Sequence, residues 1–393
     1  MSKPLTILVL TTSFPSKKTE RKRLGGGKFV LEDVKVFQTA GYNITVLAPI
    51  REGLDKFEVI DSIKVRRFPF PFQQYSSLYK NLPVHKNLGL LNFVALVFMS
   101  MKYFIEIIKE TQKLKPNLVW ANWVQVAFIA RLSLFCTSYR SKLLFTIRGS
   151  DVRNFPNWLN KIIFFFTKNL FNVYPGDPEV VEWVDQYKLN EIRVPRTYID
   201  TNIKRNIDFT RPFNLLIISR FDEQEELYRM QGIGRKLIDI VLAVVNRHEN
   251  IEITFIGDGV ALENYKTLCE GHDNVSFTGW LTKFDHYLTK ADIVLGGAGL
   301  SGVAMDAAPY GIPLLISKYY SKPLWKDKVN SLVYDPYDFE QFIATIDFAI
   351  NNRSFLVELG KKAKEDLKEY ALRTENAAEI WSQKVNDYVY DIV

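Results

Sequence analysis

The sequence is poor in the residues that build disulfide frameworks and metal sites. Its 393 residues include only two cysteines, Cys136 and Cys269, and four histidines without the spacing of metal ligands. Two cysteines cannot form a disulfide framework, and the distance between them in the sequence excludes a cysteine-based zinc site. A reducing, cytoplasmic location is the simplest interpretation of this composition.

Several motifs of nucleotide and hydrolytic chemistry are also missing. The sequence has no G-x-x-x-x-G-K-[ST], which excludes a P-loop ATPase, and no G-x-S-x-G nucleophile elbow. No D-x-D occurs, which argues against a pair of carboxylates that hold a divalent metal and a nucleotide diphosphate. The run Gly25-Gly26-Gly27 is not a full G-x-G-x-x-G, so NAD binding is a weak hypothesis.

No apolar run is long enough to span a bilayer. The longest, at residues 88–101, has about 14 residues, whereas a spanning helix needs about 20. We therefore expect a buried helix there, and the cluster at 162–166 is open to the same two interpretations. The run at 5–10 is too short for a signal peptide and predicts a buried first strand. The sequence predicts a soluble protein and leaves association with a membrane surface open.

What the sequence does contain is the composition of a globular protein with an uneven charge. Hydrophobic residues make up 47% and charged residues 24%, and the length suits two domains. Residues 1–208 carry 31 Lys and Arg against 17 Asp and Glu, a net charge of +14, whereas residues 209–393 carry 20 against 27, a net of −7. The basic half is either a solvated face or the side that meets an anionic acceptor or membrane.

Strand-like and helix-like segments alternate through both halves of the chain. This order predicts two successive α/β domains, each with a doubly wound parallel sheet. We expect an N-terminal domain at 1–208, a C-terminal domain at 209–375 and a final amphipathic helix at 376–393. The expected strands lie at 6–12, 43–49, 64–72, 117–122, 142–147 and 172–176 in the first half and at 214–219, 251–259, 274–280, 291–297 and 313–317 in the second.

Three glycine-rich turns follow expected strands. They lie at 25–27, at 257–259 and at 296–302, where a helical segment begins. Backbone N–H groups at such turns can bind phosphates, although each turn by itself is also explained as a tight strand-to-helix connection. Asp306, shortly after the third turn, could accept ribose hydroxyls, and Arg220, at the end of a strand, could neutralise a diphosphate leaving group. Their alternative roles are a solvated helix charge and a surface ion pair.

These segments resemble the retaining glycosyltransferases of the GT-B fold, the large family 4 that uses nucleotide sugars. The resemblance covers almost the whole chain, with motifs in the family's order. The segments that carry it are the opening strand, glycine loop and helix that end in AGYNITVLAP, then FTIRGSD (145–151), VPRTYIDT (194–201), IISRFDEQ (217–224), TFIGDG (254–259), NVSFTGWL (274–281) with YLTKADIVL, and DAAPYGIPLLIS (306–317).

The resemblance implies two Rossmann-like domains that face each other across a cleft, with the nucleotide sugar mainly on the C-terminal domain. It implies that Asp306 holds the ribose, that backbone groups at Trp280 and Leu281 meet the base, and that Arg220 stabilises the leaving diphosphate. It also implies that the last helix crosses back onto the first domain and that no metal is needed. The remaining implied binding residues act through their backbone: Gly26 and Gly27 from the first domain, and Gly257, Gly299, Leu300 and Ser301 from the second.

Four departures from the family pattern concern this site. Ala298 stands where the family has the first of two acidic residues eight apart, Arg148 replaces the histidine of the H-G-s-D motif, and Thr197-Tyr198 replaces an N-G pair. The family's K-G is Gln231-Gly232, and Arg229 is close enough in sequence to supply the missing cation. We count Arg220, Arg148 and Arg229 as the candidate catalytic residues.

The sequence therefore predicts a metal-independent glycosyltransferase that moves a sugar from a nucleoside diphosphate to a hydroxyl acceptor. The expected acceptor is a surface glycan or a lipid-linked intermediate, and the expected location is cytoplasmic, with peripheral attachment to the inner face of a membrane left open. The departures also support a non-catalytic GT-B subunit that binds a sugar or nucleotide, and a nucleotide-sugar epimerase is a weaker alternative. Nucleic-acid binding explains the basic half but not the diphosphate loops.

Overall fold

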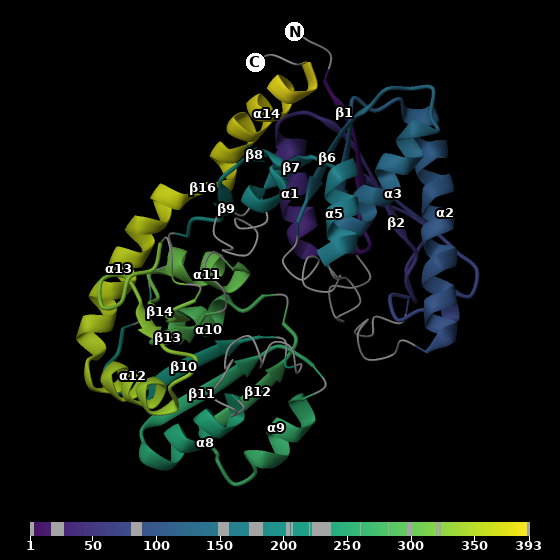
Figure 1. Ribbon diagram of the computed structural model, residues 1–393. Helices are drawn as coiled ribbons and strands as arrows, with labels where there is room; N and C mark the ends of the chain where they lie inside the picture. The colour runs from purple at the N-terminus through teal and green to yellow at the C-terminus, as the bar shows by residue number, and fades with distance from the viewer. Residues whose placement is uncertain are drawn as a thin grey trace. The chain divides into compact units, whose positions relative to one another are not determined.

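The chain divides into two compact units, each with its own sheet (Figure 1). Unit 1 comprises residues 1–175, 179–194 and 375–393, and unit 2 comprises 176–178 and 195–374. The computed structural model describes residues 4–16, 27–79, 89–147, 157–172, 184–201, 205, 207–219, 221, 237–259, 261–281, 283–296, 301–319, 321 and 324–390.

Unit 1 is built on an eight-stranded sheet in which every neighbouring pair is parallel except the edge pair β3–β4. In register, Leu8 of β1 lies between Thr45 of β2 and Val119 of β5. The strand order is β3 (Phe57–Ile60), β4 (Ile63–Phe68), β2 (Asn43–Pro49), β1 (Thr6–Leu10), β5 (Leu118–Asn122), β6 (Lys142–Thr146), β7 (Asn169–Asn172) and β8 (Asn190–Arg193).

Helices cover both faces of this sheet. Helices α2 (Leu90–Leu114), α3 (Val124–Phe135) and α5 (Asn157–Phe166) share one apolar core with the sheet. On the other face, α1 (Lys28–Thr39) and α14 (Thr374–Tyr390) meet at an aromatic cluster of Phe37, Trp120, Phe171 and Trp381, whose ring centroids lie 5.3–5.8 Å apart. Trp381 is completely buried, so α14 is part of this unit's core.

The segment expected as a buried helix is exposed along one side. Helix α2 has 25 residues, and among the described residues it alone has the length and composition to cross a bilayer. Its Met99 and Tyr103 lie in the core, yet Leu90 is 76%, Phe93 58% and Met101 58% exposed. The expectation of a buried helix is therefore wrong for that side, because a sheet covers only one side of a helix that lies across it.

Unit 2 contains a six-stranded parallel sheet and a separate two-stranded one. Its order is β12 (Val275–Gly279), β11 (Ile251–Ile256), β10 (Phe213–Ile218), β13 (Ile293–Leu295), β14 (Leu314–Ser317) and β15 (Leu332–Tyr334), and the small sheet pairs β9 (Arg196–Tyr198) with β16 (Ala371–Arg373). The helices are α8 (Leu237–Arg247), α9 (Leu262–Leu268), α10 (Asp285–Lys290), α11 (Gly302–Ala307), α12 (Phe339–Asn351) and α13 (Arg353–Tyr370), with a 3-10 turn at Ala308–Tyr310.

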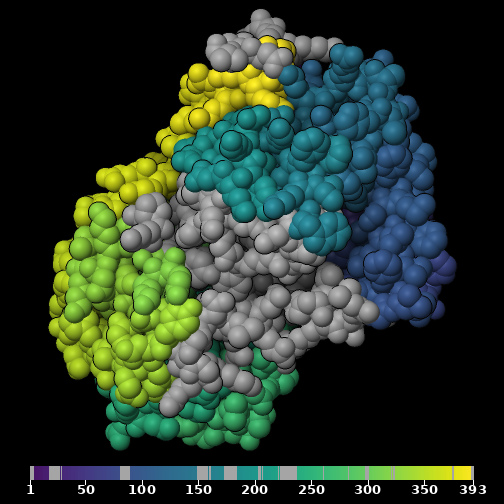
Figure 2. Space-filling view, in the orientation of Figure 1, coloured from purple at the N-terminus to yellow at the C-terminus, as the bar shows by residue number. Residues whose placement is uncertain are grey.

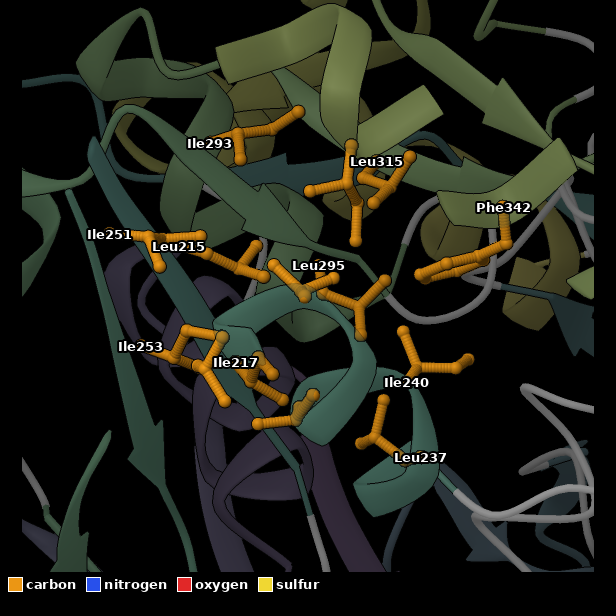
Figure 3. Close-up of a cluster of buried hydrophobic side chains, with 14 of the residues drawn as sticks. Leu215, Ile217, Leu237, Ile240, Ile251, Ile253, Ile293, Leu295, Leu315 and Phe342 are labelled. Atoms are coloured by element: carbon orange, nitrogen blue, oxygen red, sulfur yellow. The ribbon is translucent and has the colours of Figure 1, made fainter. Parts of the chain in front are cut away.

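The core of unit 2 lies between its parallel sheet and the helices α8, α9, α12 and α13. Figure 3 shows Leu215 and Ile217 of β10 directed toward Ile240 of α8, with Phe342 of α12 nearby. These strands read as continuous apolar runs because both faces of a parallel sheet are covered. That pattern explains why the sequence located them well.

The segment from 195 to 208 contacts unit 2, whereas the sequence assigned it to the first domain. Strand β9 pairs with β16, and Arg205 donates to the carbonyls of Gly311 (2.8 Å) and Ala291 (2.6 Å). In unit 1, the strand expected at 172–176 is found earlier, at Asn169–Asn172, and residues 173–183 lie outside the described residues.

Candidate active site

Both large sheets have a topological switch point beside their first strand. In unit 1 the order runs outward from β1 through β2, β4 and β3 on one side and through β5 to β8 on the other, and in unit 2 it runs from β10 through β11 and β12 on one side and through β13 to β15 on the other. Open α/β sheets bind ligands in the crevice beyond the carboxyl ends of the strands at such a point. In unit 2 the switch lies between β10 and β13, and in unit 1 between β1 and β5.

The turn at 257–259 is held against the segment that follows β10. Gly257 has φ +140°, and a Cβ there would lie 1.8 Å from the carbonyl oxygen of Ser219. A Cβ on Gly259 would lie 2.2 Å from the carbonyl oxygen of Phe221, whose N–H donates to Asp258 O at 3.1 Å. Contacts within the chain therefore require both glycines, and a role of Gly257 toward a ligand stays a prediction.

Ser301, near the end of the third glycine-rich segment, caps α11. The Ser301 hydroxyl accepts from the N–H of Ala304 at 3.3 Å. This side chain therefore fixes where the helix begins, at the carboxyl edge of the sheet between β13 and β14. The expected contact between the Ser301 N–H and a diphosphate stays a prediction.

Asp306 lies on the half-exposed side of α11. It is partly buried, and its helical spacing puts it in line with Gly302 and Tyr310, while Ala304 and Ala307 on the other side are fully buried. Burial raises the pKa of Tyr310 to about 12, helped by the hydrogen bond that its hydroxyl donates to Asp285 and, to a lesser extent, by the charge of Asp306. A carboxylate in this position is accessible to a ligand at the edge of the sheet.

Trp280 and Leu281 follow β12, at the same edge of the sheet. Trp280 is 45% exposed and Leu281 is half-buried. The preceding Gly279 has φ +72°, and its carbonyl accepts from the N–H of Gly257 at 2.9 Å. An exposed indole held beside the strand ends can stack on a planar ring.

Ser317 is a residue at this edge that the sequence did not single out. It ends β14, is 2% exposed, and its hydroxyl has no hydrogen-bond partner among the described residues. Buried hydroxyls without a partner are uncommon, so this one is a candidate to meet a ligand. The only signal in the sequence is its place at the end of an apolar strand.

In unit 1, Gly27 begins α1 beside the segment that follows β1. Its φ is +101°, and a Cβ would lie 2.5 Å from the carbonyl oxygen of Ser13. Trp123, directly after β5, has φ +76°, which is strained for a residue with a side chain, and its ring contacts Phe29 at 6.0 Å. No pattern in the sequence points to Trp123, whose N–H donates to Thr146 O at 3.1 Å.

Two arginines lie at the ends of neighbouring strands in unit 1. Arg67 is buried and donates to Glu58 (2.9 Å) and to the carbonyl of Pro15 (2.7 Å). Burial lowers the pKa of Arg51 to about 10, and the charge of Arg67 acts in the same direction. Part of the excess positive charge of residues 1–208 therefore lies on arginines that are buried within the fold.

The other candidate residues lie outside the described residues. They are the three candidate catalytic arginines, Arg148, Arg220 and Arg229, together with Gly26, Gly299, Leu300 and the substituted positions Ala298, Gln231 and Gly232. Of the substituted positions, Thr197 and Tyr198 are described, within β9. In the described part of the chain, no three His, Cys, Asp or Glu side chains are grouped as metal ligands.

A family model matches part of the chain. Residues 213–352 match the family described as Glycosyl transferases group 1. The match begins at the first residue of β10, ends just after α12 and so includes the whole six-stranded sheet of unit 2. No curated protein sequence matches the chain.

Solved structures match over nearly the full length. A sucrose-phosphate synthase from Thermosynechococcus elongatus has a TM-score of 0.71 at 14% identity, covering 99% of this chain and 100% of that one. HepE from Anabaena, in complex with UDP and glucose, has a TM-score of 0.67 at 13% identity over 97% and 99%. The apo form of the lipopolysaccharide outer core galactosyltransferase WaaB has a TM-score of 0.65 at 13% identity over 99% and 100%.

The structural matches confirm the expected fold of two Rossmann-like domains, and the family match over unit 2 supports sugar transfer as the class of activity. Because the identities are low, the structural matches show the fold alone. The family match concerns the sequence of unit 2. Unit 2 carries the sequence pattern of the group 1 glycosyl transferases, and the chain as a whole has the GT-B fold of glycosyltransferases.

Proposed function

We propose that this protein transfers a sugar from a nucleoside diphosphate sugar to a hydroxyl acceptor, without a metal and with retention at the anomeric carbon. The observation that carries the proposal is the family match over the whole sheet of unit 2, whose switch point offers a ligand edge between β10 and β13. The bond from the anomeric carbon to the diphosphate breaks, and a bond to the acceptor oxygen forms. The hydroxyl proton passes to the leaving phosphate, so no separate base is assigned.

The proposed donor is a nucleotide sugar bound at unit 2. HepE, one of the similar structures, was solved with UDP and with UDP-glucose. UDP is therefore the first nucleotide to test. The proposed contacts are the Asp306 carboxylate with the ribose, Trp280 and Leu281 with the base, and the turn that ends at Ser301 with the diphosphate.

The proposed electrostatic role belongs to arginine. The leaving diphosphate gains negative charge in the transition state, and a fixed guanidinium stabilises that charge. We assign this role to Arg220, with Arg229 as the second cation and Arg148 directed at the transferred sugar or acceptor. Charge-neutral variants of Arg220 should lower kcat much more than they raise KM for the donor.

The proposed acceptor meets unit 1. Its basic excess suits an anionic acceptor, such as a surface glycan or a lipid-linked intermediate at the cytoplasmic side of a membrane. Trp123, strained at the carboxyl edge of this sheet, adds an aromatic ring that could contact a sugar there. Both statements depend on the proposed transfer activity.

The test is nucleotide binding by a matched pair of variants. We expect Asp306→Asn to weaken UDP binding by about 1–3 kcal/mol, because it removes hydrogen bonds from a charged acceptor to the ribose. Asp285→Asn is the control, since Asp285 also acts on Tyr310 but has no proposed contact with the ribose. Isothermal titration calorimetry of both variants with UDP gives the comparison.

Three outcomes separate the proposal from its alternatives. Equal affinities in the two variants would remove Asp306 from the site. Binding of a nucleotide sugar with no hydrolysis or transfer across a donor and acceptor panel would instead support a non-catalytic subunit. Release of an epimerised free sugar in the absence of acceptor would support an epimerase.

A further inference from the structure

The outer surface of α2, α3 and α5, which we name the three-helix face, exposes many apolar side chains of unit 1. The helices are neighbours: Ser133 of α3 donates to the carbonyl of Phe104 on α2 at 3.2 Å, and Phe128 of α3 contacts Phe166 of α5 at 6.3 Å. Figure 1 shows all three on the same side of the unit 1 sheet. In Figure 2 the surface of α2 is the blue margin of this unit.

Helix α2 presents an apolar stripe on this face. Leu90, Phe93, Val97, Met101 and Ile105 recur at helical spacing and are between 41% and 76% exposed. No charged side chain interrupts the stripe over these four turns. An exposed apolar side of this length on a helix marks a contact surface, because water-facing helix sides are normally polar.

The neighbouring helices extend the apolar surface. Phe135 at the end of α3 is 65% exposed, and Phe165 near the end of α5 is 70% exposed. Trp158 and Ile162 of α5 are exposed as well. The patch is therefore wider than one helix and includes the aromatic residues that are enriched at membrane interfaces.

The charges on the three-helix face have one sign. Lys161 and Lys168 are exposed on or beside α5, and Lys109 is exposed on α2. The carboxylates of these helices are Glu106 and Glu110 of α2, both buried and both paired with Arg66. In the described part of the face, apolar groups and cations are therefore presented without an exposed carboxylate.

A cavity of about 380 Å³ opens at the edge of this face. It is lined by Arg131 of α3, by Phe165 and Phe166 of α5, and by Lys168. The Nε of Arg131 is buried and has no hydrogen-bond partner among the described residues. Two cations beside aromatic rings suit the phosphate of a lipid headgroup.

Helix α2 cannot leave the fold to span a bilayer. The Tyr103 hydroxyl is completely buried and donates to the carbonyls of Thr11 (3.1 Å), just after β1, and Leu47 (2.8 Å), within β2. Met99 and Ile107 lie in the same core. Extraction of the helix would expose this core and break the pairs of Glu106 and Glu110 with Arg66.

We propose that the three-helix face docks in the plane of an anionic phospholipid bilayer. The apolar stripe enters the interface, and the surrounding cations bind lipid phosphates. The occupant is a bilayer surface, and not a second copy of the chain, because the exposed charges of the face are all cationic and would repel the same face of another molecule. This proposal does not depend on the proposed transfer activity.

The test is sedimentation of the full chain with vesicles. The wild type should bind vesicles of equal parts phosphatidylcholine and phosphatidylglycerol more strongly than vesicles of phosphatidylcholine alone. The double variant Met101→Glu/Ile162→Glu should bind the anionic vesicles at least about tenfold more weakly, since two apolar side chains no longer enter the interface. The matched control is Leu268→Glu/Val329→Glu, at residues of unit 2 that are 44% and 49% exposed, and it should bind as the wild type does.

A second pair of substitutions tests the charges at two exposed lysines, where replacements usually have little effect on stability. Lys161→Glu/Lys168→Glu should weaken binding to the anionic vesicles by about fivefold or more per cation, and leave the weaker binding to phosphatidylcholine unchanged. Lack of wild-type binding to either vesicle would overturn the proposal, as would equal binding by the face and control variants. So would a stable dimer, measured by light scattering, that only Met101→Glu/Ile162→Glu dissociates.

Discussion

Units 1 and 2 both have a sheet with a switch point beside its first strand, but they differ in how their sheets are covered. In both, parallel strands extend in two directions from the first strand, and both cores are apolar. Unit 1 is completed by α14, from the far end of the sequence, and exposes an apolar and cationic three-helix face. Unit 2 is covered by helices such as α13, whose outer side alternates Lys with Glu and Asp. The same framework therefore supports two different surfaces, and the specialisation lies in the side chains.

The largest expected effect tests whether α14 belongs to unit 1. Trp381→Ala should lower the free energy of unfolding by about 3–5 kcal/mol, because it leaves a cavity between α14, α1 and the sheet. Hydrogen exchange should accelerate in β1 and β5 and stay unchanged in β10 and β11. Tyr390→Ala, at a half-exposed residue of the same helix, should change stability by less than about 0.5 kcal/mol. If hydrogen exchange accelerated equally in both units, α14 would not belong to the core of unit 1 alone.

The second effect is confined to unit 2. Asp292 is buried and accepts from Arg211 (2.9 and 3.1 Å), from Arg353 (3.0 and 3.2 Å) and from the N–H of Asn214 (2.8 Å). Asp292→Ala should cost about 3 kcal/mol in urea unfolding, because two partly buried guanidinium groups lose their carboxylate.

The control for this prediction is an exposed ion pair in the same unit. Glu263→Ala removes the pair with Lys266, whose side chains are 82% and 45% exposed, and should cost less than about 0.5 kcal/mol. Similar losses in both variants would mean that the Asp292 cluster is not a structural centre of unit 2.

A smaller effect concerns the glycine turns. Gly257→Ala should destabilise the protein by about 2–3 kcal/mol, since its backbone conformation is nearly exclusive to glycine and the new Cβ would overlap the Ser219 carbonyl. Gly279→Ala has positive φ but open space around it, and should cost about 1 kcal/mol. Thermal unfolding of both variants separates the steric overlap from the backbone strain. Equal losses of stability in the two variants would mean that the overlap with Ser219 contributes nothing.

The smallest expected effect depends on pH. The pKa of Tyr310 is raised to about 12, first by burial and then by its hydrogen bond to Asp285, so its neutral form favours the folded state. The unfolded chain loses this proton first as the pH rises above 10, and the contribution of Tyr310 to stability therefore falls between about pH 10 and pH 12. Tyr310→Phe should make the free energy of unfolding depend less on pH in this range. An unchanged slope in urea unfolding between about pH 9 and pH 11 would contradict the assignment.

The sequence predicted the parallel sheets better than their edges. Strands such as β2 and β11 are continuous apolar runs, and an interior position in a parallel sheet requires that pattern. Strands β9 and β16 have three residues each and exist because they pair with each other across the sequence, so no local pattern marks them. The exposure of α2 was also out of reach, since composition does not say which side of an apolar helix a sheet covers.

At the candidate site, the sequence located residues but not their constraints. Asp306 and Ser301 were identified from a motif, and the structure adds the half-exposed helix side and the cap. For Gly257 the sequence left a tight turn and an anion site open, and the close approach of Ser219 explains the glycine without a ligand. The sequence did not single out Ser317 or Trp123. The buried, unpartnered hydroxyl of Ser317 and the positive φ of Trp123 depend on how neighbouring segments pack, and no local sequence pattern records that.

The aromatic cluster on α14 has a consequence for biosynthesis. Residues 375–390 leave the ribosome only after all of unit 2 has been made. Until then, the side chains of Phe37, Trp120 and Phe171 lack their contact with Trp381. A fragment that stops at residue 194 lacks this closing helix and exposes an aromatic surface to aggregation. A fragment designed to isolate unit 1 therefore has to rejoin 375–390 to the end of β8 through a linker.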